Sequence, residues 1–355
     1  MWAVSRLPRL SAAALGMLLG LAILAAGEAW CRLFTRIHFL DSSPDLFVPG
    51  RFGWSRGNVV NGRATAFGHL VVTDGNGFRV DPDFPDPVSG RAALFLGDSV
   101  AFGSGVDERD SALGRLRRAR PGWRVYNASA IGYGLRDYVN VLDAFLPAHP
   151  DVKAVYVLMC LNDIHDLSDL AIQERLGHLA PAAPPPGQPS RDLVLIGKRF
   201  AVLQAVNDWL RSRSKLYLFL KGLASDASVR FLRHDLQFYR AYDGDFETRM
   251  ALLVAVRDRL RAAGIPFKVV VLPYEAQLRG ANADFMLPQR MICGYLGEHD
   301  VDFIDATVAF RGSGVPSHAL FLYKDPMHLS PRGHEVLFGV LSKDLATLSS
   351  GPPSG

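Results

Sequence analysis

The chain has 355 residues, of which 49% are hydrophobic and 21% charged, a composition typical of a globular protein and not of a disordered or fibrous one. Its net charge is +4, and the densest basic group, at 115–120, falls on a predicted helix with an apolar face, which argues against a nucleic-acid partner. The three cysteines, Cys31, Cys160 and Cys293, have no metal-type spacing and define no disulfide framework.

The N-terminal segment is the first predicted element. No charged residue interrupts the stretch from Leu10 to Gly27, which at about 1.5 Å rise per residue nearly matches a hydrocarbon core of about 30 Å. We therefore expect a transmembrane anchor over residues 10–30, with a short basic leader, 1–9, in the cytoplasm and the rest of the chain on the periplasmic or extracellular side. The alternative is a signal peptide cleaved after the small residues at 25–27.

The rest of the chain predicts one α/β catalytic domain with a lead-in. Residues 37–90 are rich in Gly, Pro, Asn and Asp, which predicts turns and small β-hairpins. Over residues 91–348, apolar runs alternate with amphipathic helices, as in a parallel sheet covered on both faces. The predicted strands are 92–96, 124–127, 154–159, 267–272 and 301–304.

An insert at residues 165–245 interrupts this alternation. It contains a proline-rich run and an amphipathic, arginine-bearing stretch at 198–223. A solvated loop followed by helices that cover the site is favoured over a second contact with the membrane surface. Residues 349–355 are predicted to be a disordered tail.

The first predicted strand runs directly into Gly97-Asp98-Ser99. A serine at the carboxyl end of the first parallel strand lies where open α/β sheets bind their ligands. On its own this tripeptide is equally well explained as a simple turn. Ser99 becomes a candidate nucleophile only if the chain also supplies a base.

The candidate base lies near the C-terminus, in the segment Asp325-Pro-Met-His328. On a loop, the carboxylate of Asp325 can reach one ring nitrogen of His328 while the other nitrogen faces the serine. Ser330 and Pro331 resemble a helix N-cap and first helical position, so the histidine would lie directly before a helix that restricts its movement. An isolated Asp-x-x-His is more often a surface ion pair.

Two further segments provide candidate donors for a tetrahedral oxyanion. Gly132 follows the second strand, five residues after Asn127, and a glycine lets a backbone amide approach the substrate closely. Asn162 and Asp163 follow the third strand. Each of these segments is also explained by a tight turn or helix cap, so the prediction depends on their convergence at one sheet edge.

In this order, the four segments resemble the four motif blocks of the SGNH, or GDSL-like, hydrolases. The resemblance covers residues 91–348 and implies a three-layer α/β/α fold around a five-stranded parallel sheet. The roles that it implies are nucleophile and backbone oxyanion donor for Ser99, second backbone donor for Gly132, side-chain donor for Asn162, base for His328 and orienting carboxylate for Asp325. Asp98, Asn127 and Asp163 are expected to support them.

The sequence departs from the family pattern at two positions. Cys160 stands where the third block usually has glycine, which puts the approach to Asn162 in doubt. Val100 replaces the leucine of the longer GDSL form, a hydrophobic exchange without consequence. The lead-in TDGNGFRVD and the single anchor also resemble a membrane-bound branch associated with envelope polysaccharides or lipids.

The predicted activity is hydrolysis of an O-acyl ester on an envelope carbohydrate or lipid, with no cofactor and no metal. The close alternative is an O-acyltransferase that uses the same residues on an exopolysaccharide. A third alternative is a non-catalytic module that binds glycan or lipid or acts as a scaffold. The membrane is the other expected partner, through the anchor, and nucleic acid is not expected to be one.

Overall fold

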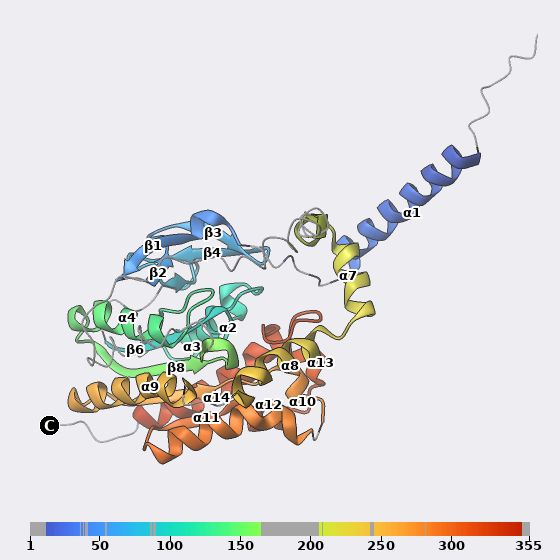
Figure 1. Ribbon diagram of the computed structural model, residues 1–355. Helices are drawn as coiled ribbons and strands as arrows, with labels where there is room; N and C mark the ends of the chain where they lie inside the picture. The colour runs from blue at the N-terminus through green and yellow to red at the C-terminus, as the bar shows by residue number, and fades with distance from the viewer. Residues whose placement is uncertain are drawn as a thin grey trace, which may run out of the picture. The chain divides into compact units, whose positions relative to one another are not determined.

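The computed structural model describes residues 12–164 and 206–349, except for a few positions. The exceptions are residues 36, 38, 40, 41, 54, 86, 88, 89, 208, 242–244 and 281. The predicted leader, most of the insert and nearly all of the predicted tail lie outside the described residues. The chain divides into two compact units, Met1–Phe39 with Pro189–Ser225, and Leu40–Gln188 with Asp226–Gly355. Figure 1 shows the elements of both units along the chain.

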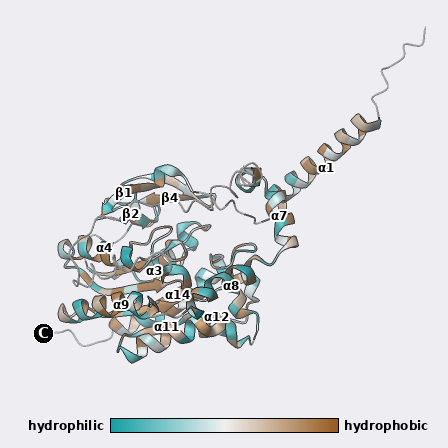
Figure 2. Cartoon of the chain, viewed as in Figure 1, coloured by the Kyte–Doolittle hydropathy of each residue, from teal (hydrophilic) through white to brown (hydrophobic). Residues whose placement is uncertain are grey.

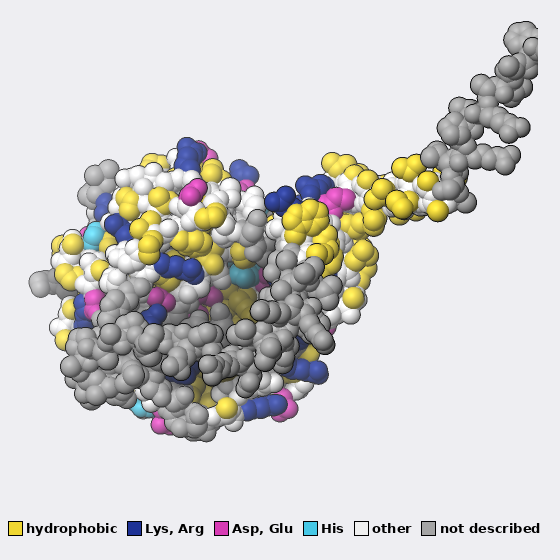
Figure 3. Space-filling model, turned by 45° about the horizontal axis from the view of Figure 1, so that its top comes forward, with side chains coloured by type: hydrophobic (Ala, Val, Ile, Leu, Met, Phe, Trp, Pro, Cys, Tyr) yellow, Lys and Arg dark blue, Asp and Glu magenta, His cyan; other side chains and the backbone are white. Residues whose placement is uncertain are grey.

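The first unit contains the apolar helix α1 (Ala12–Phe34) and the shorter helix α7 (Lys215–Ala224). Within α1, Ala13–Phe34 is long and apolar enough to be a membrane span or a signal sequence, and only 6% of its most apolar window is buried. Hydrophobic residues recur along α1 (Figure 2), and their side chains gather on its surface (Figure 3). At its C-terminal end, the Glu28 carboxylate accepts a hydrogen bond from the backbone N–H of Leu216 at 2.9 Å, in the first turn of α7.

The second unit is built on a sheet whose central strands are parallel. Its parallel part runs in the order β7, β6, β8, β9, β10. These strands are β6 (Arg91–Gly97), β7 (Trp123–Asn127), β8 (Val152–Met159), β9 (Phe267–Val271) and β10 (Phe303–Asp305). Each coincides with one of the predicted strands to within about two residues, so this part of the fold prediction is confirmed.

The predicted strand number, five, is wrong for the whole sheet, which has eight strands. The lead-in adds three antiparallel strands beyond β7, in the order β5 (Arg79–Val80), β4 (His69–Thr73) and β3 (Arg63–Ala66). The free edge of β7 would otherwise present unpaired N–H and C=O groups, and the lead-in covers it. The lead-in strands are short and separated by glycine turns. Their sequence therefore predicts hairpins, but it does not indicate which strand of the sheet they pair with.

The lead-in also forms a separate two-stranded hairpin, β1 (Phe47–Phe52) with β2 (Ser55–Asn58). The two strands pair antiparallel, with Phe47 opposite Asn58. Strand β2 lies against the helix that follows β7, through contacts described below. The lead-in from residue 40 onward is therefore an integral part of the second unit.

Helices cover both faces of the parallel strands. Along β6, every residue from Ala92 to Gly97 is buried, and because successive side chains point to opposite faces, both faces must be covered. One group of helices packs around α14 (Pro331–Ser349) and consists of α3 (Ala112–Ala119) and α12 (Ala306–Gly312). A second group packs around α9 (Asp245–Ala262) and consists of α4 (Leu135–Phe145) and α11 (Leu287–Glu298). Shorter or peripheral helices are α2 (Ser99–Phe102), α8 (Ala227–Arg240), α10 (Glu275–Leu278) and α13 (Ser317–Leu320). The layered α/β/α prediction is confirmed.

Candidate active site

Ser99 begins helix α2, two residues after the end of β6. The Asp98 side chain caps this helix by accepting a hydrogen bond from the N–H of Val100 at 2.8 Å. Strand β6 lies between β7 and β8, so the chain leaves it at the point where the strand order reverses. In open α/β sheets this switch point is the usual ligand site.

The structure brings Ser99, His328 and Asp325 together. His328 Nε2 lies 2.8 Å from Ser99 Oγ, and His328 Nδ1 lies 2.9 Å from Asp325 Oδ2. The other carboxylate oxygen of Asp325 accepts the backbone N–H of His328 at 2.7 Å and that of Met327 at 2.9 Å, which fixes the loop. Ser330 caps α14 directly afterwards, with its Oγ 3.3 Å from the N–H of Gly333. The side chains of Ser99, His328 and Asp325 thus form a continuous chain of hydrogen bonds.

Electrostatics in this group favour an imidazolium. Burial by itself lowers the pKa of His328, but the charge and hydrogen bond of Asp325, with a smaller contribution from the charge of Asp98, raise the pKa above its ordinary 6.5. Burial raises the pKa of Asp325, yet the charge and hydrogen bond of His328 hold it below its ordinary value. Asp325 is therefore ionised and able to stabilise a proton taken up by His328.

The segment containing Gly132 lies alongside the end of β6. The N–H of Ala128 donates to the carbonyl of Phe95 at 2.9 Å, and the N–H of Ala130 to that of Gly97 at 3.2 Å. Asn127 Oδ1 accepts the N–H of Ser129 at 3.3 Å and so stabilises the turn. Gly132 has φ of 76°, the left-handed region that glycine adopts without strain.

Asn162 lies at the carboxyl end of β8, in the short helix Leu161–Ile164. Burial raises the pKa of the nearby Asp98 carboxyl, against the lowering effects of the Val100 N–H, the charge of His328 and the Asn162 side chain. The hydroxyl of Tyr274 lies 3.3 Å from Asn162 Oδ1. Asn162 is thus held next to the residue that precedes Ser99, and its predicted role as an oxyanion donor remains a prediction.

Asp163 holds the turn that contains the unusual cysteine. Its Oδ2 accepts the backbone N–H of Cys160 at 2.9 Å and the hydroxyl of Tyr138 at 2.6 Å. Burial and the charge of Asp98 raise the pKa of Asp163 well above its ordinary value. Cys160 itself is buried in the hydrophobic core.

Sequence reasoning missed Phe67, which packs against His328, the candidate base. The Phe67 ring lies edge-on to the His328 ring, with centroids 4.9 Å apart. Phe67 and Gly68 form the turn between β3 and β4, and both have positive φ, 50° and 77°. Gly68 between two alternating stretches is compatible with a tight hairpin turn, but nothing local indicated which residue the tip of the hairpin would touch.

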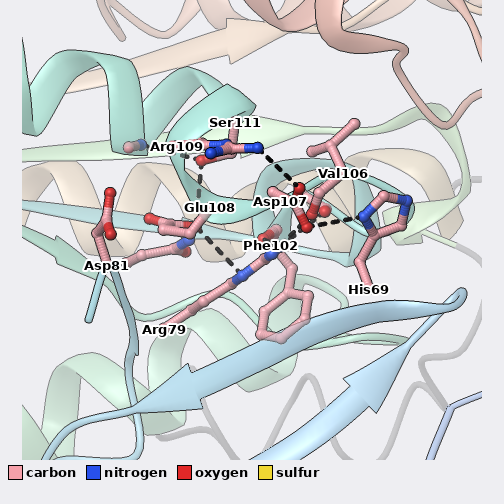
Figure 4. Close-up of polar contacts among 12 residues, drawn as sticks. His69, Arg79, Asp81, Phe102, Val106, Asp107, Glu108, Arg109 and Ser111 are labelled. Carbon is pink, nitrogen blue, oxygen red and sulfur yellow. Dashed lines mark hydrogen bonds and ion pairs between the residues drawn. The ribbon is translucent and has the colours of Figure 1, made fainter. Parts of the chain in front are cut away.

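Sequence reasoning also missed a buried ionic cluster around Arg79 and Glu108, next to Phe102 at the end of α2 (Figure 4). Arg79 donates to the carbonyls of Phe102 and Gly103 at 2.9 and 2.7 Å, just beyond α2, and its Nε lies 3.2 Å from Glu108. Arg117 pairs with the same carboxylate at 2.8 Å. Both arginines are almost completely buried, so this cluster fixes the loop that follows Ser99. An arginine in a short polar strand gives no sequence signal of such burial.

No protein-family model matches the chain, and no curated protein matches it. Solved structures that resemble it include LAE5, an alpha/beta hydrolase enzyme from the metagenome of Lake Arreo, with 13% identity, a TM-score of 0.40, and coverage of 73% of this chain and 96% of that chain. Axe2, an acetylxylan esterase from Geobacillus stearothermophilus, has 17% identity, a TM-score of 0.39, and coverage of 72% and 94%. A protein described as a lipolytic member of the G-D-S-L family, from Desulfitobacterium hafniense, has 14% identity, a TM-score of 0.38, and coverage of 72% and 99%.

These likenesses concern the fold alone, and the site rests on this chain's own geometry. Its parallel strands, the helices on both faces and the position of Ser99 after the first of those strands are what the four motif blocks implied. The chain therefore has a three-layer α/β/α fold around a central parallel sheet.

Proposed function

We propose that the chain is a serine esterase that hydrolyses an O-acyl ester through an acyl-enzyme on Ser99. The observation that carries this proposal is the pair of hydrogen bonds at His328, 2.8 Å to Ser99 Oγ and 2.9 Å to Asp325. A hydroxyl is a weak nucleophile near neutral pH and needs a base within this distance. The base in turn needs a carboxylate to hold its tautomer and stabilise the imidazolium.

The proposed reaction has two stages. Ser99 Oγ attacks the ester carbonyl while His328 takes its proton, and the tetrahedral intermediate releases the alcohol, to which His328 returns the proton. Water then attacks the acyl-enzyme while His328 takes its proton. The bond from the acyl carbon to Ser99 Oγ breaks, His328 returns the proton to Oγ, and the acid leaves. The negative oxygen of each intermediate would accept hydrogen bonds from the N–H groups of Ser99 and Gly132 and from the side chain of Asn162.

The proposed substrate is an O-acylated carbohydrate or lipid of the cell envelope. The apolar helix α1 supports this placement, because its length and composition suit a single membrane span. A basic leader ahead of it favours a catalytic unit on the non-cytoplasmic side. The substrate would then be an ester that a membrane-attached enzyme can reach outside the cytoplasm.

A serine-directed fluorophosphonate tests the nucleophile. We expect it to label the full-length protein once, on the peptide that contains Ser99, and to leave the Ser99→Ala variant unlabelled. Ser212→Ala is a matched control, since Ser212 is exposed and bonded only to the carbonyl of Trp209 among described contacts. Equal labelling of wild type and Ser99→Ala, or no labelling of either together with no esterase activity, would defeat the proposal.

The acyl acceptor is tested separately. The purified protein is incubated with an activated acetyl ester, with and without polysaccharide, and free acetate is compared with acetylated product. We expect acetate release that does not depend on the polysaccharide. Predominant acetylation of the polysaccharide would instead show transfer to a sugar hydroxyl.

A further inference from the structure

A lead-in arginine contacts the peptide group that the proposed esterase would use as an oxyanion donor. Resting on that proposed function, we propose that Arg56 orients and polarises the peptide unit joining Ile131 to Gly132. Arg56 lies in β2, more than seventy positions from this unit, and its Nη2 donates a hydrogen bond to the carbonyl oxygen of Ile131. Arg56 would be a positioning residue, because it acts through the backbone and does not touch the substrate.

Strand β2 holds the segment after β7 at several points. Asn58 Nδ2 lies 3.3 Å from the carbonyl oxygen of Ser129. The hydroxyl of Tyr133 donates to the carbonyl of Arg56 itself. Ser55 Oγ donates to Asp137, which in turn accepts the N–H of Gly134 at 3.0 Å. Together these contacts span residues 129–137, the stretch that contains Gly132.

The geometry of a peptide unit links the two groups. The carbonyl of Ile131 and the N–H of Gly132 belong to one planar unit, and the described chain contains no cis peptide bond. In a trans unit the C=O and N–H point in opposite directions. A donor on the Ile131 oxygen therefore leaves the N–H of Gly132 directed away from Arg56 and available to a ligand.

The charge of the guanidinium strengthens that N–H. A hydrogen bond from a cation to an amide oxygen draws electron density toward the oxygen and makes the N–H of the same unit a better donor. No carboxylate among the described residues forms an ion pair with Arg56, so its charge is not neutralised by an acidic neighbour in that part of the chain. The guanidinium carbon of Arg56 lies 4.7 Å from the centroid of the Phe47 ring, and this cation–π contact helps to hold the guanidinium group in place.

Gly132 fits this arrangement for two reasons. Its φ of 76° is rarely adopted by residues with a side chain. A Cβ on Gly132 would also overlap the guanidinium of Arg56, the nearest side chain to that position. The contact with Arg56 thus requires a glycine at 132, and the two residues are expected to depend on each other.

The test compares full-length variants in detergent with an activated acetyl ester. Arg56→Gln retains the Gly132 amide but removes the cation, so we expect kcat to fall by about 5- to 50-fold, less than the roughly 100- to 1,000-fold loss of a whole oxyanion donor, with little change in KM. Arg56→Lys should recover part of this loss. A boronic acid, which forms a negatively charged tetrahedral adduct on serine, should lose affinity in parallel with kcat.

The matched control is Arg51→Gln, on the other strand of the same hairpin. Arg51 is exposed and its guanidinium donates to the carbonyl of Gly75 at 3.5 Å, so the charge change is equal but the oxyanion segment is not touched. We expect its kcat and boronate affinity to match wild type. Melting temperatures of all variants show whether each is folded. If Arg56→Gln does not fold, the kinetics of Arg56→Lys are compared with those of wild type instead.

Two results would overturn the role of Arg56. One is a folded Arg56 variant whose kcat and boronate affinity equal those of wild type. The other is an Arg56 variant that raises KM at unchanged kcat, which would show a direct contact with the ground-state substrate. Both outcomes presuppose an active wild type labelled at Ser99, so they are distinguishable from failure of the esterase proposal itself.

Discussion

His328 Nε2 and Ser99 Oγ lie 2.8 Å apart although 229 positions separate them in the chain. Ser99 follows the central strand β6, and His328 precedes helix α14, which packs against α3. The sheet thus defines where the serine lies, and the last helix of the chain defines where the histidine lies. The predictions below follow from this arrangement and from the groups packed around it.

The pH dependence of kcat/KM should show one acidic limb. His328 must be neutral at Nε2 to accept a proton, and its pKa lies above the ordinary 6.5, because Asp325 and Asp98 outweigh the lowering effect of burial. Activity should therefore be lost as pH falls through a midpoint above 6.5. In Asp325→Asn, burial without the carboxylate should move this midpoint to lower pH and reduce kcat. Initial rates across pH for both proteins measure the shift, and an unchanged midpoint would contradict the assignment.

His334, a buried histidine in α14, is not expected to contribute to that limb. Burial, followed by the charges of Arg79 and Arg115, lowers the pKa of His334 to about 3. Its Nδ1 accepts the N–H of Ala112 at 3.3 Å, which requires the neutral ring. Nuclear magnetic resonance titration of the imidazole protons should show His334 unchanged while His328 titrates.

Replacing the proposed side-chain donor should affect the transition state more than substrate binding. In Asn162→Ala we expect kcat to fall by about 100- to 1,000-fold with KM nearly unchanged, because the donor would bind only the developing oxyanion. Steady-state kinetics with an acetyl ester measure both constants. An increase in KM alone would assign Asn162 to substrate binding.

The ring of Phe67 should contribute to the alignment of the base. Phe67→Gly removes the edge-on contact with His328 while suiting the positive φ of 50° at this position. We expect kcat/KM to fall by about 2- to 10-fold, the equivalent of an aromatic contact of about 0.5–1.5 kcal/mol. Leu70→Gly, which truncates an exposed side chain on β4, tests whether loss of any lead-in side chain has the same effect. Equal losses in the two variants would contradict a specific role for the ring.

The buried ionic cluster should matter for stability. Arg79→Met leaves Glu108 paired with Arg117 alone and leaves carbonyls after α2 without their donor, so the free energy of unfolding should fall by about 3–5 kcal/mol. Arg109→Gln is the control, because its carboxylate partners are exposed and 3.8 Å away, and its cost should stay within about 1 kcal/mol. Urea unfolding measures both. Similar values for the two variants would show that the cluster is not a structural determinant.

The mass of the purified protein distinguishes an uncleaved membrane anchor from a cleaved signal peptide. If α1 is an anchor, the protein purified from membranes should have the intact mass of the full chain apart from processing of Met1, and it should resist extraction with carbonate. A mature N-terminus shortly after Gly27 would show instead that the segment is a signal peptide.

Much of the central fold was predictable because it depends on local patterns. The apolar runs at 92–96 and 154–159 have the length and composition of strands buried on both faces, and they form β6 and β8. Ser99, Asp325 and His328 were identifiable because their chemistry and their order relative to the strands pointed to a nucleophile with its base. The apolar stretch at 10–27 likewise predicted a long helix.

The remaining features depend on partners distant in the sequence. Only the tertiary structure decided that β5 docks on β7, that Phe67 meets His328, and that Arg56 bonds the carbonyl of Ile131. A short strand or a single arginine has the same local propensities wherever it docks, since edge pairing, ring contacts and backbone hydrogen bonds are set by which surfaces meet. The sequence thus determined which residues can do chemistry, whereas packing decided which groups orient them.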